Sequence, residues 1–201
     1  MILKEDSGNV AEQRNFKLYK PYGYLSQFVN NQKRRKNKGL LGELFPFPPE
    51  TMSIGRLDED SEGLLLLTTN GKNSEKVRRK SVEKEYYVQV DGVICENAIR
   101  DLQNGLEISI YGKKYQTLPC KAFPLDQPPH FPERGKKIRD ERHGPTSWIS
   151  ITITEGKFRQ VRKMTAAVGF PTLRLVRIRI GEEQLDKMAP GEVIEVSEFH
   201  L

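Results

Sequence analysis

Apolar residues along the chain occur in short blocks with the spacing of strands, and turn-forming residues separate the blocks. Alternating or continuous apolar patterns predict strands at residues 16–19, 52–54, 64–68, 85–90, 148–154 and 173–180. A hairpin that turns at Tyr111 and Gly112 is expected within residues 106–118. The longest aliphatic run, Leu64 to Leu67, is far too short to span a bilayer.

Other segments have the spacing of helices. Residues 96–104 predict a helix that ends at Gly105, and residues 158–168 predict a second one. The second helix has four apolar residues for its buried face: Val161, Met164, Ala167 and Val168. A short basic helix is expected near residues 74–79. Strands and helices mixed in this way indicate an α/β or α+β fold whose sheet is mixed or largely antiparallel, not doubly wound and parallel.

Three polar segments interrupt this pattern. Residues 1–14 carry both charges without periodicity, so we expect a flexible leader before one compact unit at residues 15–201. Residues 30–38 hold five basic residues and no acid, which suits contact with phosphates and a solvated loop equally well. Residues 124–146 contain five prolines and dense charge, so we expect a long surface loop or mobile flap there.

Composition narrows the class of protein. The 201 residues include 33 Lys and Arg against 27 Asp and Glu, and the net charge of +6 is compatible with a polyanionic partner. Cys95 and Cys120 lie far apart and the three histidines are dispersed, so neither a disulfide framework nor a bound metal is indicated. The N-terminus lacks the pattern of a signal peptide. We expect a cytoplasmic monomer that uses no metal and contacts no membrane.

The densest cluster of candidate reactive groups is the segment GRLDEDSEG at residues 55–63. Its carboxylates are Asp58, Glu59, Asp60 and Glu62. A carboxylate acts as nucleophile or general base only when it is ionised and aimed, which usually requires partial burial beside a cation. Arg56 and the basic residues of the second helix can supply that cation, and an acid in basic surroundings suits chemistry on RNA. Taken alone, the segment is more typical of a charged turn between strands.

Residues 55–71, GRLDEDSEGLLLLTTNG, resemble the signature loop of the small-ribosomal-subunit type of pseudouridine synthase, whose pattern is GRLDxDSEGLLLLTNDG. Three further segments match this family in order: KPYG at 20–23, KEYYVQVDG at 84–92, and EGKFRQVRKM at 155–164 followed by RLVRIRIG. Ordered matches across the chain from residue 16 are more specific than one motif. The departures are small: TNG at residues 69–71, Phe158 and Lys163 replace commoner residues.

The resemblance implies the pseudouridine synthase fold, in which a mixed, mainly antiparallel sheet is flanked by helices and loops and forms two lobes around the active-site cleft. It also implies isomerisation of uridine to pseudouridine without a cofactor. Asp58 takes the position of the catalytic aspartate, and Asp60 is then a loop acid. Arg162 takes the position of the basic residue that pairs with the aspartate and keeps it ionised, with Arg159 as the alternative partner.

Tyr86 takes the position of the family's tyrosine, which is expected to stack on the target base and whose hydroxyl is suited to proton removal. Its neighbour Tyr87 points to the opposite face of the strand and suits a place half in the core. Because the target uridine must be extruded from folded RNA, basic side chains are expected to grip it. We expect these RNA contacts from the loop at 134–142 and from Lys20, Lys33, Arg34, Arg35, Arg56, Arg159 and Lys163.

Little sequence precedes the KPYG segment, so the chain resembles the stand-alone branch of the family, which has no separate N-terminal RNA-binding domain. That branch implies large-subunit (23S) ribosomal RNA as the substrate. Two alternatives remain: the same chemistry on small-subunit RNA or transfer RNA, and a non-catalytic RNA-binding factor of ribosome assembly. The sequence does not separate these substrates, and it does not identify the modified uridine.

Overall fold

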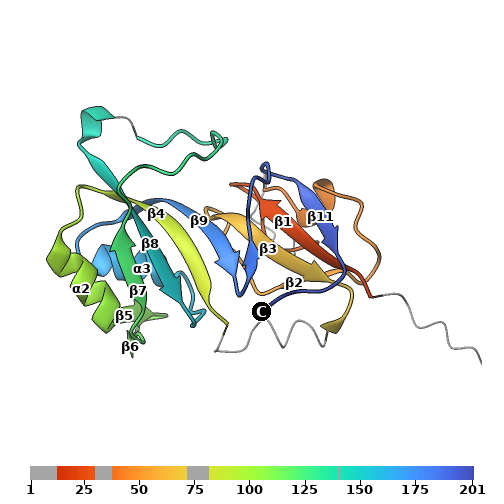
Figure 1. The fold of residues 1–201 in the computed structure, drawn as a ribbon, viewed down its shortest axis with the longest axis horizontal. Helices are drawn as coiled ribbons and strands as arrows, with labels where there is room; N and C mark the ends of the chain where they lie inside the picture. Colours follow the sequence, from red (N-terminus) through yellow and green to blue (C-terminus); the bar gives the residue numbers. More distant parts are fainter. Residues whose placement is uncertain (1–12, 30–37, 72–81, 140) are drawn as a thin grey trace, which may run out of the picture.

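A large sheet organises the computed structural model, which describes residues 13–29, 38–71, 82–139 and 141–201. Within these residues the main path of strands runs β11-β1-β3-β9-β4-β8-β7, with β2 beside β3 and β10 beside β9 (Figure 1). The strands are β1 (Asn15–Lys20), β2 (Met52–Ile54), β3 (Glu62–Thr68), β4 (Lys84–Asp91), β7 (Lys121–Pro124), β8 (Thr146–Ile153), β9 (Thr172–Ile180), β10 (Glu183–Gln184) and β11 (Val193–Val196).

The sheet has two halves that meet at β9. Strands β1, β2, β3 and β11 form one half, and β4, β7 and β8 form the other (Figure 1). β3 and β9 pair in parallel at Glu62–Val176 and Gly63–Arg177, whereas the other described pairs are antiparallel. Gly63 permits this junction because it has φ 105° and a Cβ would lie 2.3 Å from the Arg177 carbonyl oxygen. The mixed, mainly antiparallel sheet predicted from the sequence is confirmed.

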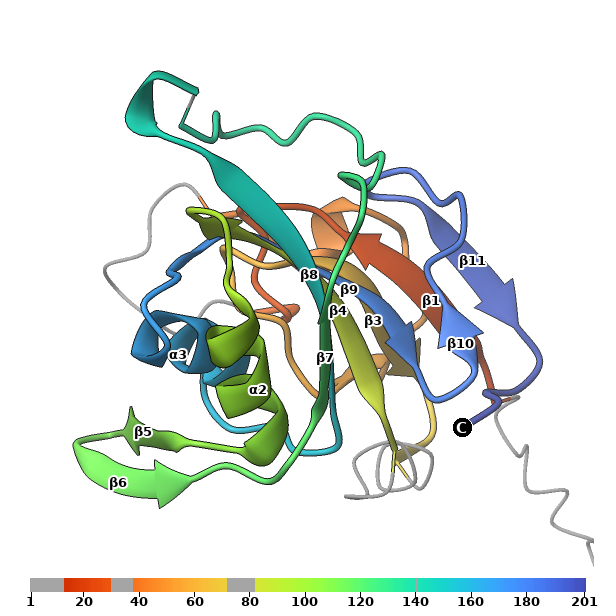
Figure 2. The ribbon, with the colours of Figure 1, turned by 60° about the vertical axis from the view of Figure 1, so that its left-hand side comes forward.

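At β3 both faces of the sheet are buried, because side chains of this strand alternate between two hydrophobic clusters. Leu65 and Leu67 join the cluster covered by helices α2 (Glu96–Asn104) and α3 (Gln160–Ala167), together with the 3-10 helix η1 (Leu41–Glu43). Leu64 and Leu66 join the other, which Leu185 and Met188 of the C-terminal segment complete. Figure 2 shows α2 and α3 together on one side of the sheet. This packing fixes the position of the loop that precedes β3.

Two of the three predicted helices lie in the described residues, and the second of them is shorter than predicted at both ends. The helix at 96–104 has the expected residues and ends at Gly105, whose φ is 79°. The second helix begins at Gln160 rather than at residue 158, and Ala167 is exposed instead of buried. The helix expected at 74–79 and most of the leader lie outside the described residues.

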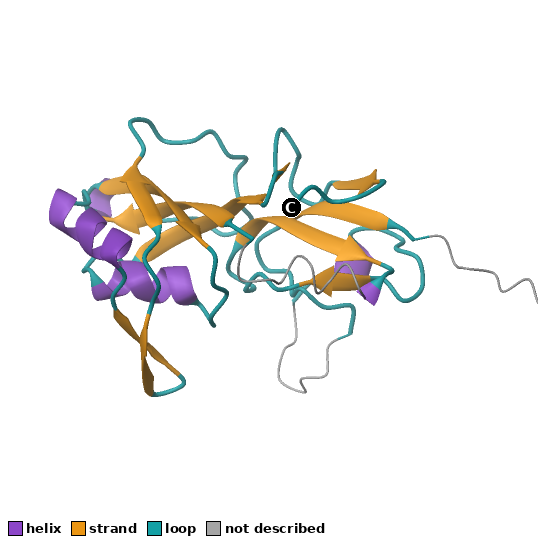
Figure 3. Ribbon diagram, turned by 60° about the horizontal axis from the view of Figure 1, so that its bottom comes forward, coloured by secondary structure: helices purple, strands orange, loops and turns teal. Residues whose placement is uncertain are grey.

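The predicted hairpin is confirmed as β5 (Glu107–Ile110) and β6 (Lys113–Gln116), a separate two-stranded sheet that extends away from the main body (Figure 3). Tyr111 and Gly112 have φ values of 50° and 78°, as a two-residue hairpin turn of the I′ type requires.

The long loop before β8 includes the 3-10 helix η2 (Glu141–His143) and packs against the sheet. The Phe131 and Trp148 ring centroids lie 5.8 Å apart, and Arg139 forms an ion pair with Asp91. These contacts fix part of a segment that the sequence predicts to be a surface loop or mobile flap.

Candidate active site

The segment 55–61 connects β2 to β3 and is held from behind by the KPYG region. Ser26 Oγ donates to the Leu57 carbonyl at 2.9 Å and accepts from the Leu57 amide at 3.0 Å. The Gly23 amide donates to the Glu59 carbonyl at 2.9 Å, and the Ser61 amide closes a turn on the Asp58 carbonyl at 3.0 Å. Because the backbone is fixed on both sides, the Asp58 carboxylate has a defined direction.

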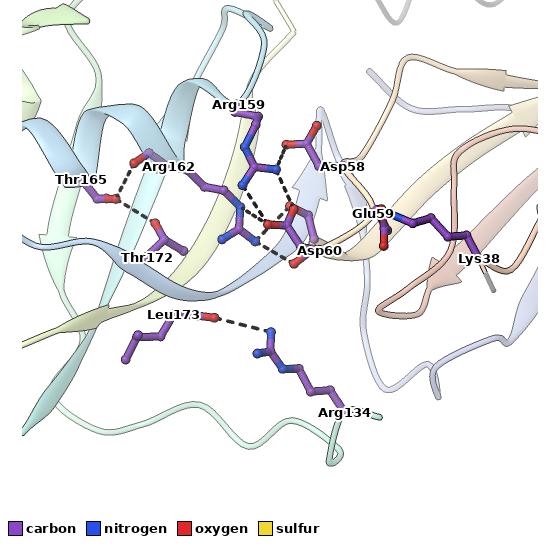
Figure 4. Close-up of polar contacts among 11 residues, drawn as sticks. Lys38, Asp58, Glu59, Asp60, Arg134, Arg159, Arg162, Thr165, Thr172 and Leu173 are labelled. Atoms are coloured by element: carbon purple, nitrogen blue, oxygen red, sulfur yellow. Dashed lines mark hydrogen bonds and ion pairs between the residues drawn. The ribbon is translucent and has the colours of Figure 1, made fainter. Parts of the chain in front are cut away.

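Two arginines and two aspartates form a compact cluster at this turn (Figure 4). Arg159 binds the Asp60 carboxylate through two parallel hydrogen bonds of 2.8 Å, and the same guanidinium lies 3.7 Å from Asp58 Oδ2. Arg162 donates to the Asp60 carbonyl at 2.7 Å, and its Nε lies 3.6 Å from Asp60 Oδ2. Asp60 therefore holds both arginines, while the Asp58 carboxylate accepts no short hydrogen bond among the contacts of the described residues.

Arg159 occupies this place because it is not part of the helix. It is the N-cap of α3 and adopts a left-handed conformation, φ 52° and ψ 35°, which a residue with a side chain adopts at a cost of about 1–3 kcal/mol. The prediction that Arg162 pairs with Asp58 is wrong. The alternative, Arg159, lies within ion-pair distance, and Arg162 instead supports the turn through the backbone of Asp60.

The two aspartates differ in electrostatic environment. Burial raises the pKa of Asp58 above its ordinary value, although Arg159 opposes the rise and Asp60 adds to it. Burial would also raise the pKa of Asp60, but the hydrogen bonds from Arg159 and the charge of Arg162 outweigh it and lower the pKa. One carboxylate is thus kept anionic as an anchor, and the other is closer to protonation, as a reactive carboxylate often is.

Asp58 lines a pocket of about 1180 Å³ at the junction of the two halves of the sheet. Tyr86 of β4 lines the same pocket, as do Arg56 and Arg159. Tyr86 is only 8% exposed and packs in the core cluster with α3, so its ring is rigidly placed. Tyr87 points to the opposite face and is half-buried against Phe131, as expected, although Tyr86 is the more deeply buried of the two.

Lys20 is not available for RNA contact. Its side chain is fully buried, and its ammonium donates to the carbonyls of Pro21 at 2.9 Å and Tyr24 at 2.7 Å. Burial lowers the pKa of Lys20 to about 7, although the carboxylates of Glu62, Asp60 and Asp58 oppose that shift. The predicted RNA contact at Lys20 is therefore wrong, and this side chain braces the backbone behind the loop.

The other residues predicted to contact RNA lie in different surroundings. Arg56 is exposed at the pocket, and Arg159 is half-exposed beside Asp58. Lys163 donates to the Ser109 carbonyl at 2.6 Å and lies outside the pocket lining. Their contact with RNA stays a prediction. Three of the predicted contacts lie outside the described residues: Lys33, Arg34 and Arg35.

The sequence predicted Asp60 only as a loop acid, whereas in the structure it anchors both arginines. The sequence did contain a signal for this role, namely two carboxylates two residues apart and two arginines three residues apart. Among the described residues, no group of His, Cys, Asp or Glu side chains is arranged to hold a metal ion. No helix in the described ranges is long and apolar enough to cross a membrane.

Comparison with known proteins identifies the family. The family described as "RNA pseudouridylate synthase" matches residues 16–167, which include the loop, Tyr86 and both arginines. The chain belongs to this family. The synthase is accordingly an isomerase that acts on RNA, as the resemblance seen in the sequence implies.

Named relatives cover most of the synthase. It is 42% identical over 175 residues to ribosomal large subunit pseudouridine synthase E of Xanthomonas axonopodis pv. citri (strain 306), covering 86% of this chain and 88% of the relative. It is 40% identical over 191 residues to the protein of the same name from Vibrio vulnificus (strain CMCP6), covering 94% and 77%. A crystal structure of a pseudouridylate synthase superposes with a TM-score of 0.72 at 28% identity, covering 92% of this chain and 70% of that one.

Proposed function

We propose that this synthase converts a uridine of large-subunit ribosomal RNA into pseudouridine, with Asp58 as the catalytic carboxylate. The observation that carries the role of Asp58 is its place in the pocket, where Arg159 lies 3.7 Å away and Asp60 takes the short hydrogen bonds of that arginine. The substrate follows from relatives at 42% and 40% identity that are named for the large ribosomal subunit.

The reaction breaks the bond between N1 of uracil and C1′ of ribose and forms a bond between C5 and C1′. The proton at C5 is lost and N1 becomes protonated, so the product is an isomer of the substrate and no other group is gained or lost. Asp58 acts at C1′ or assists release of the base, and either role needs the ionised carboxylate. Tyr86 stacks on the uracil while it turns, and its hydroxyl is suited to assist removal of the C5 proton.

The neighbours of Asp58 hold it for this step. Asp60 fixes the Arg159 guanidinium by two hydrogen bonds, and Arg159 then restrains the direction and the charge of Asp58. Arg162 supports the turn from the helix side, and Arg56 and Arg159 add positive charge to the pocket lining, which suits the phosphates of an extruded nucleotide.

The test is release of tritium from ribosomal RNA labelled at C5 of uridine, with large-subunit RNA, small-subunit RNA and transfer RNA supplied separately. Wild-type protein is expected to release tritium from large-subunit RNA, and Asp58→Ala is expected to release none while binding RNA with similar affinity, because affinity comes mainly from phosphate contacts. The matched control is Glu59→Gln, the next carboxylate in the same turn, which pairs with Lys38 instead of an arginine of the cluster. It should retain most of the activity.

Other results would contradict defined parts of the proposal. Release from small-subunit RNA or transfer RNA alone would keep the chemistry and overturn the substrate. Binding of RNA without release from any substrate, naked or partly assembled, would favour a non-catalytic assembly factor. If Asp58→Ala lost RNA binding together with turnover, the loop would have a structural role.

A further inference from the structure

Two exposed aromatic rings stack on each other at the rim of the pocket that contains Asp58. The Tyr111 and Phe158 rings lie 5.2 Å apart between centroids and are inclined by only 15°. Tyr111 is 79% exposed and Phe158 is 46% exposed, although both line the pocket. Tyr111 is at the tip of the β5–β6 hairpin, and Phe158 directly precedes Arg159. Residues distant in sequence thus form one aromatic surface next to the reactive cluster.

The hairpin does not depend on this stack for its anchorage. Lys163 of α3 donates to the Ser109 carbonyl of β5 at 2.6 Å. Glu155 accepts from the Leu118 amide at 2.9 Å, which follows β6, and from the Tyr115 hydroxyl of β6. These polar contacts already attach both strands of the hairpin to the segment around α3. Anchorage therefore leaves the exposed aromatic pair unexplained.

An aromatic side chain is also unfavourable at the backbone position of Tyr111. Its φ of 50° lies in the left-handed region, which Asn and Gly occupy more readily than an aromatic residue. A polar turn would close the same hairpin without exposing a large ring to water. One positive charge borders the aromatic surface, because the Lys163 ammonium lies 5.3 Å from the Phe158 ring centroid. A second cation lines the same pocket, where the Lys157 ammonium lies 4.8 Å from the Tyr115 ring centroid. Exposed rings beside cations are the elements of a single-stranded nucleic-acid site.

We propose that Tyr111 and Phe158 form a stacking platform for an unpaired base of the substrate RNA, a base near the target uridine in sequence. This inference rests on the proposed function. The platform adds a contact that a base-paired neighbour cannot make, so it selects uridines in unpaired segments. The stacking energy is tolerant of base identity, because every base has a π face. The platform thus selects RNA conformation more than sequence.

The test uses a short single-stranded RNA with one uridine and with 2-aminopurine beside it, and measures binding by anisotropy and stacking by quenching of the 2-aminopurine fluorescence. Wild-type protein should quench the probe. Tyr111→Ala and Phe158→Leu should weaken binding about tenfold, or about 1.4 kcal/mol, and lose the quenching. Tyr111→Phe should retain both, because it keeps the ring. The matched control is Phe123→Ala, since Phe123 is 48% exposed and lies outside the pocket.

Unchanged affinity and quenching in Tyr111→Ala would overturn the platform, and so would an equal loss in Phe123→Ala. If Tyr111→Ala failed to fold, as judged by thermal unfolding, Phe158→Leu would decide the question. Binding and fluorescence need no turnover, so the two proposals fail separately. A failed platform leaves tritium release by the wild type intact, whereas a failed function leaves stacking without release.

Discussion

Two clusters of acids and arginines differ in how completely their charges are paired, although their acids lie within a few residues of each other in the sequence. Asp58 and Asp60 are half-exposed at the pocket. Both nearby arginines contact Asp60, whereas only Arg159 lies within ion-pair distance of Asp58. Glu62, at the start of β3, is 2% exposed and binds Arg174 of β9 through two hydrogen bonds of 2.8 and 2.9 Å. The acid–arginine pairing is therefore incomplete at Asp58 and complete at Glu62.

This contrast shows how the fold separates structural support from reactivity. Arg174 also donates to the Pro132 carbonyl, so the buried pair joins β3, β9 and the long loop. Its groups have their hydrogen bonds made inside the protein and have little capacity left for a substrate. In the outer cluster, Asp60 takes the short bonds and leaves Asp58 at 3.7 Å from the guanidinium. Reactivity lies where the pairing is incomplete.

Breaking the buried pair is expected to have the largest effect. Glu62→Gln removes one charge and leaves the Arg174 guanidinium buried without compensation, which should cost about 3–5 kcal/mol of unfolding free energy. Urea denaturation measures this loss. The control is Asp60→Asn, whose half-exposed ion pairs should contribute only about 1 kcal/mol to stability. Equal losses in the two variants would contradict the distinction between a closed and an open cluster.

Asp60→Asn should instead reduce catalysis. The variant loses the charged, two-bond support of Arg159 but keeps the backbone carbonyl that Arg162 binds. Misplacement of a positioned group by about 1 Å can cost roughly a hundredfold in rate, and we expect a loss of that order in kcat with similar RNA affinity. Single-turnover tritium release at saturating RNA measures it. Wild-type kcat in Asp60→Asn would show that Arg159 needs no anchor.

Much of the fold follows from local patterns, because the core strands repeat apolar residues that have no other stable environment. β2, α2 and the hairpin appear at the expected residues. The short strands β7 and β11 were not predicted, because each has four residues and belongs to the sheet only through its partner. Such strands depend on tertiary pairing, which is not visible in their own sequence.

The site was predicted in its residue types but not in all its contacts. Asp58 and Tyr86 reach the same pocket, whereas the partner of Asp58 depends on the left-handed conformation of Arg159, which helical spacing does not reveal. The burial of Lys20 was detectable, because strand alternation places it on the face of Phe16 and Leu18. A functional motif can therefore identify the members of a site while backbone conformation decides their pairing.

The pH dependence of turnover tests how strongly Arg159 controls the charge of Asp58. Asp58 must be ionised to act, so kcat should fall as the pH decreases through the pKa of Asp58, which burial raises and Arg159 lowers. Arg159→Gln removes the lowering charge, so the acidic limb of the profile should move to higher pH and the gap from wild type should widen as the pH falls.

The matched variant is Arg162→Gln, whose charge also lowers the pKa of Asp58 but acts more weakly than that of Arg159. Its acidic limb should therefore move less, with kcat measured at saturating RNA so that lost phosphate contacts do not contribute. Superimposable profiles for Arg159→Gln and wild type would mean that Asp58 does not limit the rate through its ionisation. A larger shift in Arg162→Gln would return the pairing role to Arg162, because the arginine that governs the charge of Asp58 must be the one whose loss moves its titration most.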